Sequence, residues 1–288
     1  MLRIQNLSKT YANGTQALKS VSLDIDKGMF GLLGPNGAGK SSLMRTIATL
    51  QEADSGSIYL HQINVLKEKD RVRRLLGYLP QEFGVYPKVS AEVLLNHLAV
   101  LKGITEAKER KAIVEALLHK TNLYQARKKN LGGYSGGMKQ RFGIAQALLS
   151  NPQLIIVDEP TAGLDPAERN RFHNLLSELG ENTVVILSTH IVEDVKELCT
   201  DMAIINQGQV LLKDHPLKAL EAIKGKVWQK SVEKSAVEAY KAHFNVISDR
   251  MIAGKPNLHI WSDTQPESGF EPVEADLEDV YFSTIKNQ

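Results

Sequence analysis

The spacing of hydrophobic and polar positions changes along the chain, and each spacing predicts a different kind of element. Over the first 30 residues apolar positions alternate with polar ones, as at Val21, Leu23 and Ile25, which predicts strands with one buried face. The apolar run "MFGLLG" then predicts a buried strand, and "SSLMRTIATL" predicts the helix after it. Two later runs, "LIIVDEP" and "TVVILSTH", are typical of parallel strands covered on both faces.

Between residues 90 and 150 the pattern becomes helical. Ser90 is placed to cap a first helix, which Gly103 ends. We expect three leucines on the buried face of this helix: Leu94, Leu98 and Leu101. The segment "TEAKERKAIVEALLHK" predicts a second helix. Its buried side is assigned to Ile113, Ala116 and Leu117. Strands and helices then alternate again up to about residue 220.

The last part of the chain has a weaker pattern. It predicts a strand at "KVWQKSV", a helix over 233–242 and strands near 245–252 and 257–262. A closing helix, "DLEDVYFSTI", carries one apolar side formed by Leu277, Val280, Tyr281 and Ile285. We therefore expect a main domain over 1–220, with a helical part at about 82–150, and an accessory domain over 221–288.

Composition narrows the class of protein. The 288 residues carry a net charge of only +2, which lacks the basic excess typical of nucleic-acid binding, so no nucleic acid is expected. The lone cysteine, Cys199, indicates a reducing compartment and a buried apolar role. No apolar run approaches the roughly 18 residues of a membrane span, and the N-terminus lacks a signal-peptide core. We expect a cytoplasmic protein whose membrane part, if one exists, belongs to another chain.

The segment "GPNGAGKS" predicts a phosphate-binding loop, because it lies between an apolar strand and a helix. Glycines let consecutive N–H groups converge on phosphate oxygens, and the helix N-terminus adds positive charge. Lys40 is expected at the β- and γ-phosphates, and Ser41 at Mg²⁺. A glycine turn with a chance lysine is the alternative, which this context disfavours. The loop residues assigned to nucleotide are Gly34, Pro35, Asn36, Gly37, Ala38, Gly39, Lys40, Ser41 and Ser42.

An acidic pair follows the buried run "LIIVDEP". Asp158 is placed to hold Mg²⁺ directly or through water, and Glu159 to polarise the attacking water as general base. Alone, the pair could simply end a strand and begin a turn. Together with the Lys40 loop it indicates a nucleoside triphosphatase.

The stretch "YSGGMKQR" resembles a second anion seat. Ser135 is placed to cap the following helix, and Gly136 and Gly137 leave its N–H groups open, which suits a terminal phosphate. Taken alone, this pattern favours a plain helix cap. Because the Lys40 loop already surrounds its own nucleotide, the second seat would more usefully serve a nucleotide held by another copy.

These motifs, together with "YLPQ", "AGLDP" and "STH", resemble the ATP-binding cassette (ABC) family over about residues 1–220, and they occur in the order typical of that family. Tyr134 departs from the usual leucine before Ser135. The resemblance implies an α/β fold with a P-loop NTPase (RecA-like) core. An antiparallel β subdomain, an inserted α-helical subdomain and a small α+β C-terminal extension would complete it.

The resemblance also implies a head-to-tail homodimer or pseudo-dimer with two ATP molecules, each shared between Lys40 of one subunit and Ser135 and Gly137 of the other. Tyr11 would stack on adenine, and Gln81 would sense Mg²⁺ and the attacking water. Asp165 would contact the opposite subunit, and His190 would hold the γ-phosphate. Individually, Tyr11 could be an exposed strand aromatic, Gln81 a loop amide and His190 a satisfied strand-end histidine.

Three functions compete. The favoured one is the ATP-hydrolysing subunit of a transporter at the cytoplasmic face of the cell membrane, working with a separate permease that docks on the helical region after Gln81. The ending "ADLEDVYFSTI" is similar to the tails of bacterial exporters, which favours export. A soluble cassette ATPase acting on DNA or ribosomes is the rival, but the chain has one cassette and no sustained heptads. A regulatory module would tolerate loss of Lys40 or Glu159, and both are present.

Overall fold

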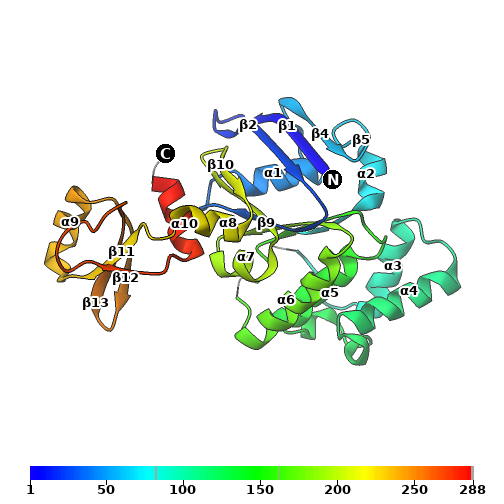
Figure 1. Cartoon of the computed structure of the whole chain (residues 1–288). Helices are drawn as coiled ribbons and strands as arrows, with labels where there is room; N and C mark the ends of the chain where they lie inside the picture. The colour runs from blue at the N-terminus through cyan, green and yellow to red at the C-terminus, as the bar shows by residue number, and fades with distance from the viewer. Residues whose placement is uncertain (82, 162, 287–288) are drawn as a thin grey trace.

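The computed structural model describes residues 1–81, 83–161 and 163–286, and its main part is built around a six-stranded sheet (Figure 1). The strand order is β10-β9-β3-β8-β7-β6. These strands are β3 (Gly28–Leu33), β6 (Leu76–Leu79), β7 (Leu154–Asp158), β8 (Val184–Thr189), β9 (Asp201–Asn206) and β10 (Gln209–Asp214). Neighbours pair in parallel except β10, which is antiparallel to β9. Every residue of β7 and β8 is buried, as predicted from their continuous apolar runs.

The register of this sheet brings the functional loops together. Leu33 pairs with Thr189, and Asp158 pairs with Ser188, so β3, β7 and β8 end at the same level. Because the strands are parallel, the loops that follow them leave from one edge of the sheet. This is the edge at which open α/β sheets bind their ligands.

A second, antiparallel sheet covers one side of the core, in the order β2-β1-β4-β5. Its strands are β1 (Leu2–Thr10), β2 (Gln16–Ile25), β4 (Ser55–Leu60) and β5 (Ile63–Asn64). The predicted alternation in β2 is confirmed, since Val21, Leu23 and Ile25 are buried. Helix α1 (Lys40–Ile47) shares one apolar cluster with residues of both sheets, so the helix that follows the phosphate loop is held on both sides.

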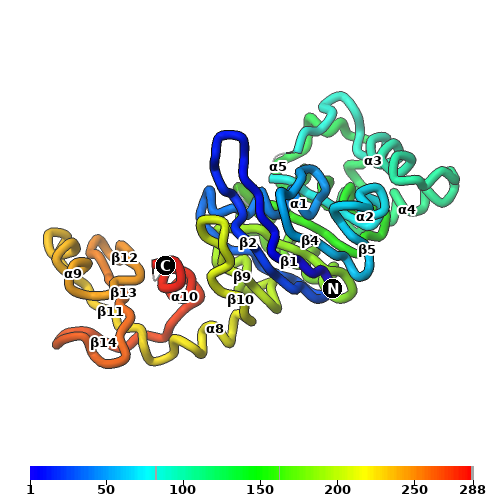
Figure 2. The backbone as a smooth tube through the Cα atoms, turned by 90° about the horizontal axis from the view of Figure 1, so that it is seen from above, coloured from blue at the N-terminus to red at the C-terminus, as the bar shows by residue number. Residues whose placement is uncertain are grey.

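The helical region lies at one end of the molecule (Figures 1 and 2). It contains α3 (Ala91–Leu101), α4 (Ala107–Lys120) and α5 (Gly136–Ala147), with short 3₁₀ turns at Tyr124–Ala126 and Leu131–Gly133. Ser90 caps α3 as predicted, accepting a hydrogen bond from Val93 N at 3.4 Å. Glu82, where the helical part was expected to begin, lies outside the described residues.

Two of the predicted helix faces are wrong in part. In α3, Leu94 is buried, but Leu101 is 70% exposed, and Ala91, Leu95 and Ala99 complete the packed face. In α4 the fully buried residues are Val114 and Leu118, while the predicted Ile113 and Leu117 are only partly buried and Ala116 is exposed. Apolar residues lie on two neighbouring sides of α4, so its sequence allows either side to be buried. Packing against α3 and α5 selects the side observed.

A short helix, α2 (Lys69–Leu75), was missed in the sequence. It has seven residues, of which only Val72 is buried, so there is almost no apolar periodicity to detect. It lies immediately before β6 and supplies part of the apolar cavity described below.

On the other face of the central sheet, α6 (Pro166–Gly180) and α7 (Val192–Leu198) pack over β3, β7 and β8. The shared cluster includes Phe172 and Leu176 of α6 and Val195 of α7. Cys199, which directly follows α7, is a buried free cysteine, and burial raises the pKa of its thiol. The predicted apolar role of this residue is confirmed.

The remaining elements form the C-terminal part, which lies beside the main core in Figures 1 and 2. They are α8 (Pro216–Ile223), β11 (Val227–Ser231), a 3₁₀ turn at Lys234–Ala236, α9 (Val237–His243), β12 (Val246–Ile252), β13 (Lys255–Trp261), β14 (Glu271–Pro272) and α10 (Leu277–Lys286). The sheet order is β12-β13-β11-β14. Helix α10 contacts α7, β9 and β10 of the main part, as well as α8 and β12. Within the described residues, no helix has the length and apolar character needed to cross a membrane.

Candidate active site

The phosphate loop joins β3 to α1, and close backbone contacts explain its glycines. A Cβ on Gly34 would meet the carbonyl oxygen of Ile205 at 2.3 Å, and one on Gly39 would meet that of Ala17 at 2.4 Å. Gly39 also has φ +108°, a conformation that other residues rarely adopt. Gly37 has φ +81° and no atom within 4 Å of its Cβ position, so the top of the loop stays open.

The side chain of Lys40 lies across the loop. Its Nζ donates to the carbonyl oxygens of Gly34 (2.6 Å) and Pro35 (3.2 Å) and lies 3.9 Å from Glu159 Oε1. Burial lowers the pKa of this ammonium, while the carboxylates of Glu159 and Asp158 oppose that shift. A cation held in this way is suited to binding phosphate oxygens.

Asp158 ends β7 with a buried carboxylate that lacks a complete set of partners. Its Oδ1 has no hydrogen-bond partner among the described residues. Burial raises the pKa of this carboxyl, against the smaller opposing effects of the nearby Ser188, Lys40 and Ser41 side chains. Mg²⁺ prefers hard oxygen ligands and is usually held by one or two carboxylates together with substrate phosphates. The free oxygen near Ser41 therefore fits a magnesium ion.

Glu159 follows in a strained backbone conformation, with φ +50°. Its N–H donates to Ser188 O at 2.9 Å, which fixes the turn after β7 against β8. Its Oε2 accepts a hydrogen bond from His190 Nδ1 at 2.6 Å, and the histidine side chain is 54% exposed. The pair is thus joined although 31 residues separate its members in the sequence.

Most of these groups line one cavity of about 610 Å³, whereas Asp158 and Gly34 are not part of its lining. Among the residues predicted from the sequence, its lining includes Tyr11, Gln81, Glu159, His190 and 35–42 of the phosphate loop. Tyr11 is oriented by its hydroxyl, which forms hydrogen bonds of 2.9 Å with Ser42 Oγ and with Gln51 Oε1. The arrangement can accommodate a phosphorylated ligand at the loop and an aromatic base at Tyr11.

Sequence reasoning missed several lining residues. Gln16, Lys19 and Gln207 border the cavity, although they belong to no recognisable motif. They are brought there by backbone contacts, such as Gly208 N donating to Ala38 O at 2.9 Å and Lys19 N donating to Gly208 O at 2.8 Å. Gly208 permits this approach, because a Cβ there would meet Ala17 O at 2.8 Å, and this glycine was the local signal that could have indicated it.

The second predicted seat lies elsewhere. Ser135 caps α5, accepting from Met138 N at 3.2 Å, and Asp165 caps α6, accepting from Glu168 N at 2.9 Å. None of the described residues lining the cavity at Lys40 belongs to α5 or α6. A Cβ on Gly137 would meet Glu168 Oε2 at 2.4 Å, so this glycine permits close contact between the two helices.

Comparison with known proteins decides the family. The model described as "ABC transporter" matches residues 18–162. The chain is 39% identical to the uncharacterized ABC transporter ATP-binding protein YxlF of Bacillus subtilis (strain 168), over 74% of this chain and 70% of that protein. The chain belongs to the ABC transporter family. A second relative in that organism, the linearmycin resistance ATP-binding protein LnrL, is 37% identical over 73% of this chain and 68% of its own length.

The solved structures agree with this assignment. A dimeric post-hydrolysis state of the ATP-binding cassette MJ0796, bound to ADP and Pi, has a TM-score of 0.68 and 27% identity, covering 75% of this chain and 98% of that one. The expected P-loop NTPase fold is thereby confirmed. This ABC protein is the ATP-binding subunit of a transporter and an ATPase.

Proposed function

We propose that two cassettes of this kind close head to tail around two ATP molecules, and that this closure drives export through a separate membrane permease at the cytoplasmic face of the cell membrane. One observation carries the proposal. The structure contains both the Lys40 cavity and the capped start of α5 at Ser135. Within one chain, however, no described residue of α5 lines that cavity. A second copy would supply the missing helix end, as either an identical or a related cassette.

The contacts in and beside the cavity support the following roles. Lys40 and the N–H groups of the loop bind the β- and γ-phosphates. Ser41, Asp158 and Gln81 would hold Mg²⁺, and a bound ion would supply positive charge beside the phosphates. Glu159 takes a proton from the attacking water, and His190, hydrogen-bonded to it at 2.6 Å, orients the carboxylate and contacts the γ-phosphate. Tyr11 stacks on the adenine.

In the closed dimer the second copy completes the site. Ser135, Gly136 and Gly137 at the start of α5 bind the γ-phosphate of the opposite nucleotide, and Asp165 at the start of α6 contacts the opposite subunit. The close approach of Gly137 and Glu168 holds the starts of α5 and α6 together, so both helix ends contact the partner as one unit. Hydrolysis separates the γ-phosphate from the rest of the nucleotide and loosens the clamp.

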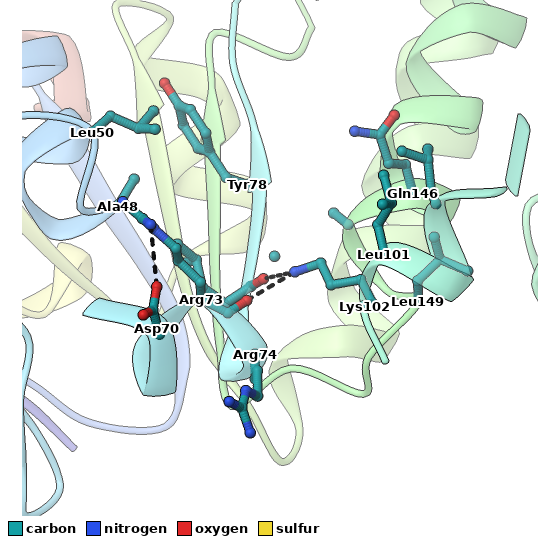
Figure 3. A pocket seen from close by; sticks show the side chains of 14 residues that line it. Ala48, Leu50, Asp70, Arg73, Arg74, Tyr78, Leu101, Lys102, Gln146 and Leu149 are labelled. Atoms are coloured by element: carbon teal, nitrogen blue, oxygen red, sulfur yellow. Dashed lines mark hydrogen bonds and ion pairs between the residues drawn. The ribbon is translucent and has the colours of Figure 1, made fainter. Parts of the chain in front are cut away.

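A second cavity, of about 480 Å³, is a candidate binding site for the permease (Figure 3). Leu50 and Tyr78 of the core and Leu101 and Leu149 of the helical region line it, and Leu50 and Leu101 are 56% and 70% exposed. Lys102 joins the two sides, its Nζ donating to the carbonyl oxygens of Arg73 and Leu76 at 2.9 Å each. We assign this cavity to a cytoplasmic segment of the permease, with apolar side chains against the leucines and an acidic group facing Arg74.

Export is supported by a relative. LnrL is named as a linearmycin resistance protein, and resistance to such a compound is consistent with its removal from the cell. The division of the chain into a cassette over 1–220, with a helical part at about 82–150, and an accessory domain over 221–288 is also part of the proposal.

The Glu159→Gln variant tests the proposal. Its amide cannot accept the proton of water, so ATP turnover should fall by about 100- to 10,000-fold while ATP binding is kept. Light scattering should then show a monomer that becomes a dimer when ATP and Mg²⁺ are added.

Ser135→Arg in the same background is the matched control, because it should bind ATP as a monomer and fail to dimerise. Loss of monomer ATP binding in that control would mean that the second seat acts within one chain. A dimer indifferent to ATP would place the contact outside the nucleotide sites.

A further inference from the structure

A buried carboxylate on α7 has no part in the mechanism described above. Asp194 is completely buried, and burying a carboxylate is costly unless donors surround it. Its Oδ2 accepts from Thr161 Oγ1 at 2.6 Å and from Thr189 Oγ1 at 3.3 Å. Its Oδ1 accepts from Arg169 Nε at 2.9 Å and lies 2.9 Å from His173 Nε2. The carboxylate thus joins four side chains from three other segments of the chain.

Three of these partners come from the segments that carry the proposed active-site groups. Thr161 is two residues beyond Glu159, Thr189 immediately precedes His190, and Arg169 lies one helical turn beyond Asp165. Thr189 Oγ1 also accepts from Ile191 N at 2.9 Å, so the same hydroxyl shapes the turn that holds His190. The other neighbour, His173, places its Nδ1 2.7 Å from Glu197 Oε2 and ties α6 back to α7.

From this arrangement we infer that Asp194 is a positioning residue for ATP hydrolysis. It holds Glu159, His190 and the start of α6 in one fixed relation, so that the water-activating pair and the helix end facing the second subunit move as a unit. The inference rests on the proposed roles of those groups. Asp194 does not line the cavity at Lys40 and acts through Thr161, Thr189 and Arg169.

The network is suited to this role because directional hydrogen bonds in a buried site restrict geometry more than apolar packing does. The strained backbone of Glu159, with φ +50°, persists only if the surrounding structure determines it. The Thr161 hydroxyl anchors the segment just after Glu159 to α7 through its hydrogen bond with Asp194. Loss of this anchor lets the carboxylate of Glu159 depart from its productive position, and catalysis is sensitive to displacements of about 1 Å.

The test compares turnover with ATP affinity. Asp194→Asn should lower kcat for ATP at least tenfold and leave the Kd for ATP of the isolated subunit within about threefold of the wild type. Thr161→Val, which removes the hydroxyl at nearly constant volume, should lower kcat in the same way. Thr161→Ser keeps the hydroxyl and should restore most of the activity.

Asp279→Asn is the matched control, because Asp279 is also completely buried and lies 2.7 Å from a histidine nitrogen, His259 Nδ1, and neither residue lines the cavity at Lys40. It should lower the unfolding temperature and leave kcat unchanged. If Asp194→Asn and Thr161→Val lower only the unfolding temperature, as this control does, the inference is wrong. If Asp194→Asn fails to fold, equal kcat values for Thr161→Val and Thr161→Ser overturn it.

One further measurement separates this inference from the proposed function. In the Glu159→Gln background, Asp194→Asn should cause much less than its tenfold loss in the wild type, because one of the groups that it positions, the water-activating carboxylate, is already disabled. A full additional tenfold loss there would show that Asp194 does not act through Glu159. Normal turnover of Glu159→Gln alone would instead contradict the proposed general base.

Discussion

At the scale of single residues, the two carboxylates at the end of β7 differ in their partners. Glu159 is paired with His190, whereas Asp158 keeps a buried oxygen without a partner among the described residues. An unsatisfied buried carboxylate destabilises the nucleotide-free protein, since burial favours the neutral form. The raised pKa of Asp158 records this cost, which a bound cation would remove.

This cost predicts a pH-dependent stability gain for Asp158→Asn. A carboxyl whose pKa is raised by folding opposes folding only when it is ionised, so its penalty is absent below the unfolded pKa of about 3.9 and grows as pH rises through the folded pKa. Without nucleotide and Mg²⁺, Asp158→Asn should therefore unfold at a higher temperature at pH 7, by about 2–4 °C for each kcal/mol removed. The gain should shrink toward pH 4.

Calorimetry in a chelating buffer measures this effect. Asp165→Asn is the control, because Asp165 is exposed and asparagine caps a helix as well as aspartate does. Its unfolding temperature should stay near that of the wild type. An unchanged or lower unfolding temperature for Asp158→Asn at pH 7 would mean that the attraction of Lys40 outweighs burial.

At the scale of elements, α3 serves two surfaces. Leu94 and Ala99 pack inside the helical region, while Leu98 and Leu101 face the cavity shared with α2 and β6. A helix with apolar residues on a single stripe needs only one partner. The exposed Leu101, beside the partly buried Leu98, is consistent with a partner outside this chain.

We expect Leu101→Glu to uncouple the cassette from its permease. A charged side chain at this position would face the apolar lining of the cavity, so transport and permease-dependent ATP turnover should fall at least tenfold in the reconstituted complex. The ATPase activity of the isolated subunit should stay within about twofold. Val93→Glu is the control, since Val93 is on the same helix, is 60% exposed and does not line the cavity. Equal transport by both variants would rule out this binding site.

At the scale of the whole molecule, the C-terminal part shares its core with the cassette. One apolar cluster runs from Leu187 in the central sheet and Val195 of α7 to Leu277 and Val280 of α10. The helix that closes the chain therefore packs on α7, which carries Asp194, as well as on its own sheet. The proposed boundary near residue 220 separates two sheets that are joined by this helix.

This shared core predicts that the chain unfolds as one cooperative unit through α10. Leu277→Ala, at a side chain that is 1% exposed, should destabilise the whole protein by about 2–5 kcal/mol and move a single calorimetric transition. Phe282→Ala on the same helix, at 36% exposure, should cost much less. A separate low-temperature transition for Leu277→Ala, with the main one unmoved, would show that the accessory part is independent of the cassette.

Much of the fold could be predicted because its determinants are local. The apolar runs in the sequence correctly predict the buried strands, and α10 has its predicted apolar side at Leu277, Val280 and Tyr281. Helix α2 and the packed face of α4 could not be predicted, because the first has almost no apolar pattern and the second has two nearly equivalent faces. In both cases the neighbouring helices and strands, rather than the local sequence, select the structure.

The sequence by itself determined the phosphate loop, the acidic pair and the cap of α5, because glycine conformations, apolar runs and helix caps depend on residues close together in the chain. The tertiary structure alone decided that Glu159 meets His190, that Gln207 reaches the cavity and that Asp194 gathers Thr161, Thr189 and Arg169. These contacts follow from the register of parallel strands and the packing of helices on them. Such long-range arrangements leave no periodic signal in the sequence, because each partner needs only to lie at the right end of its own element.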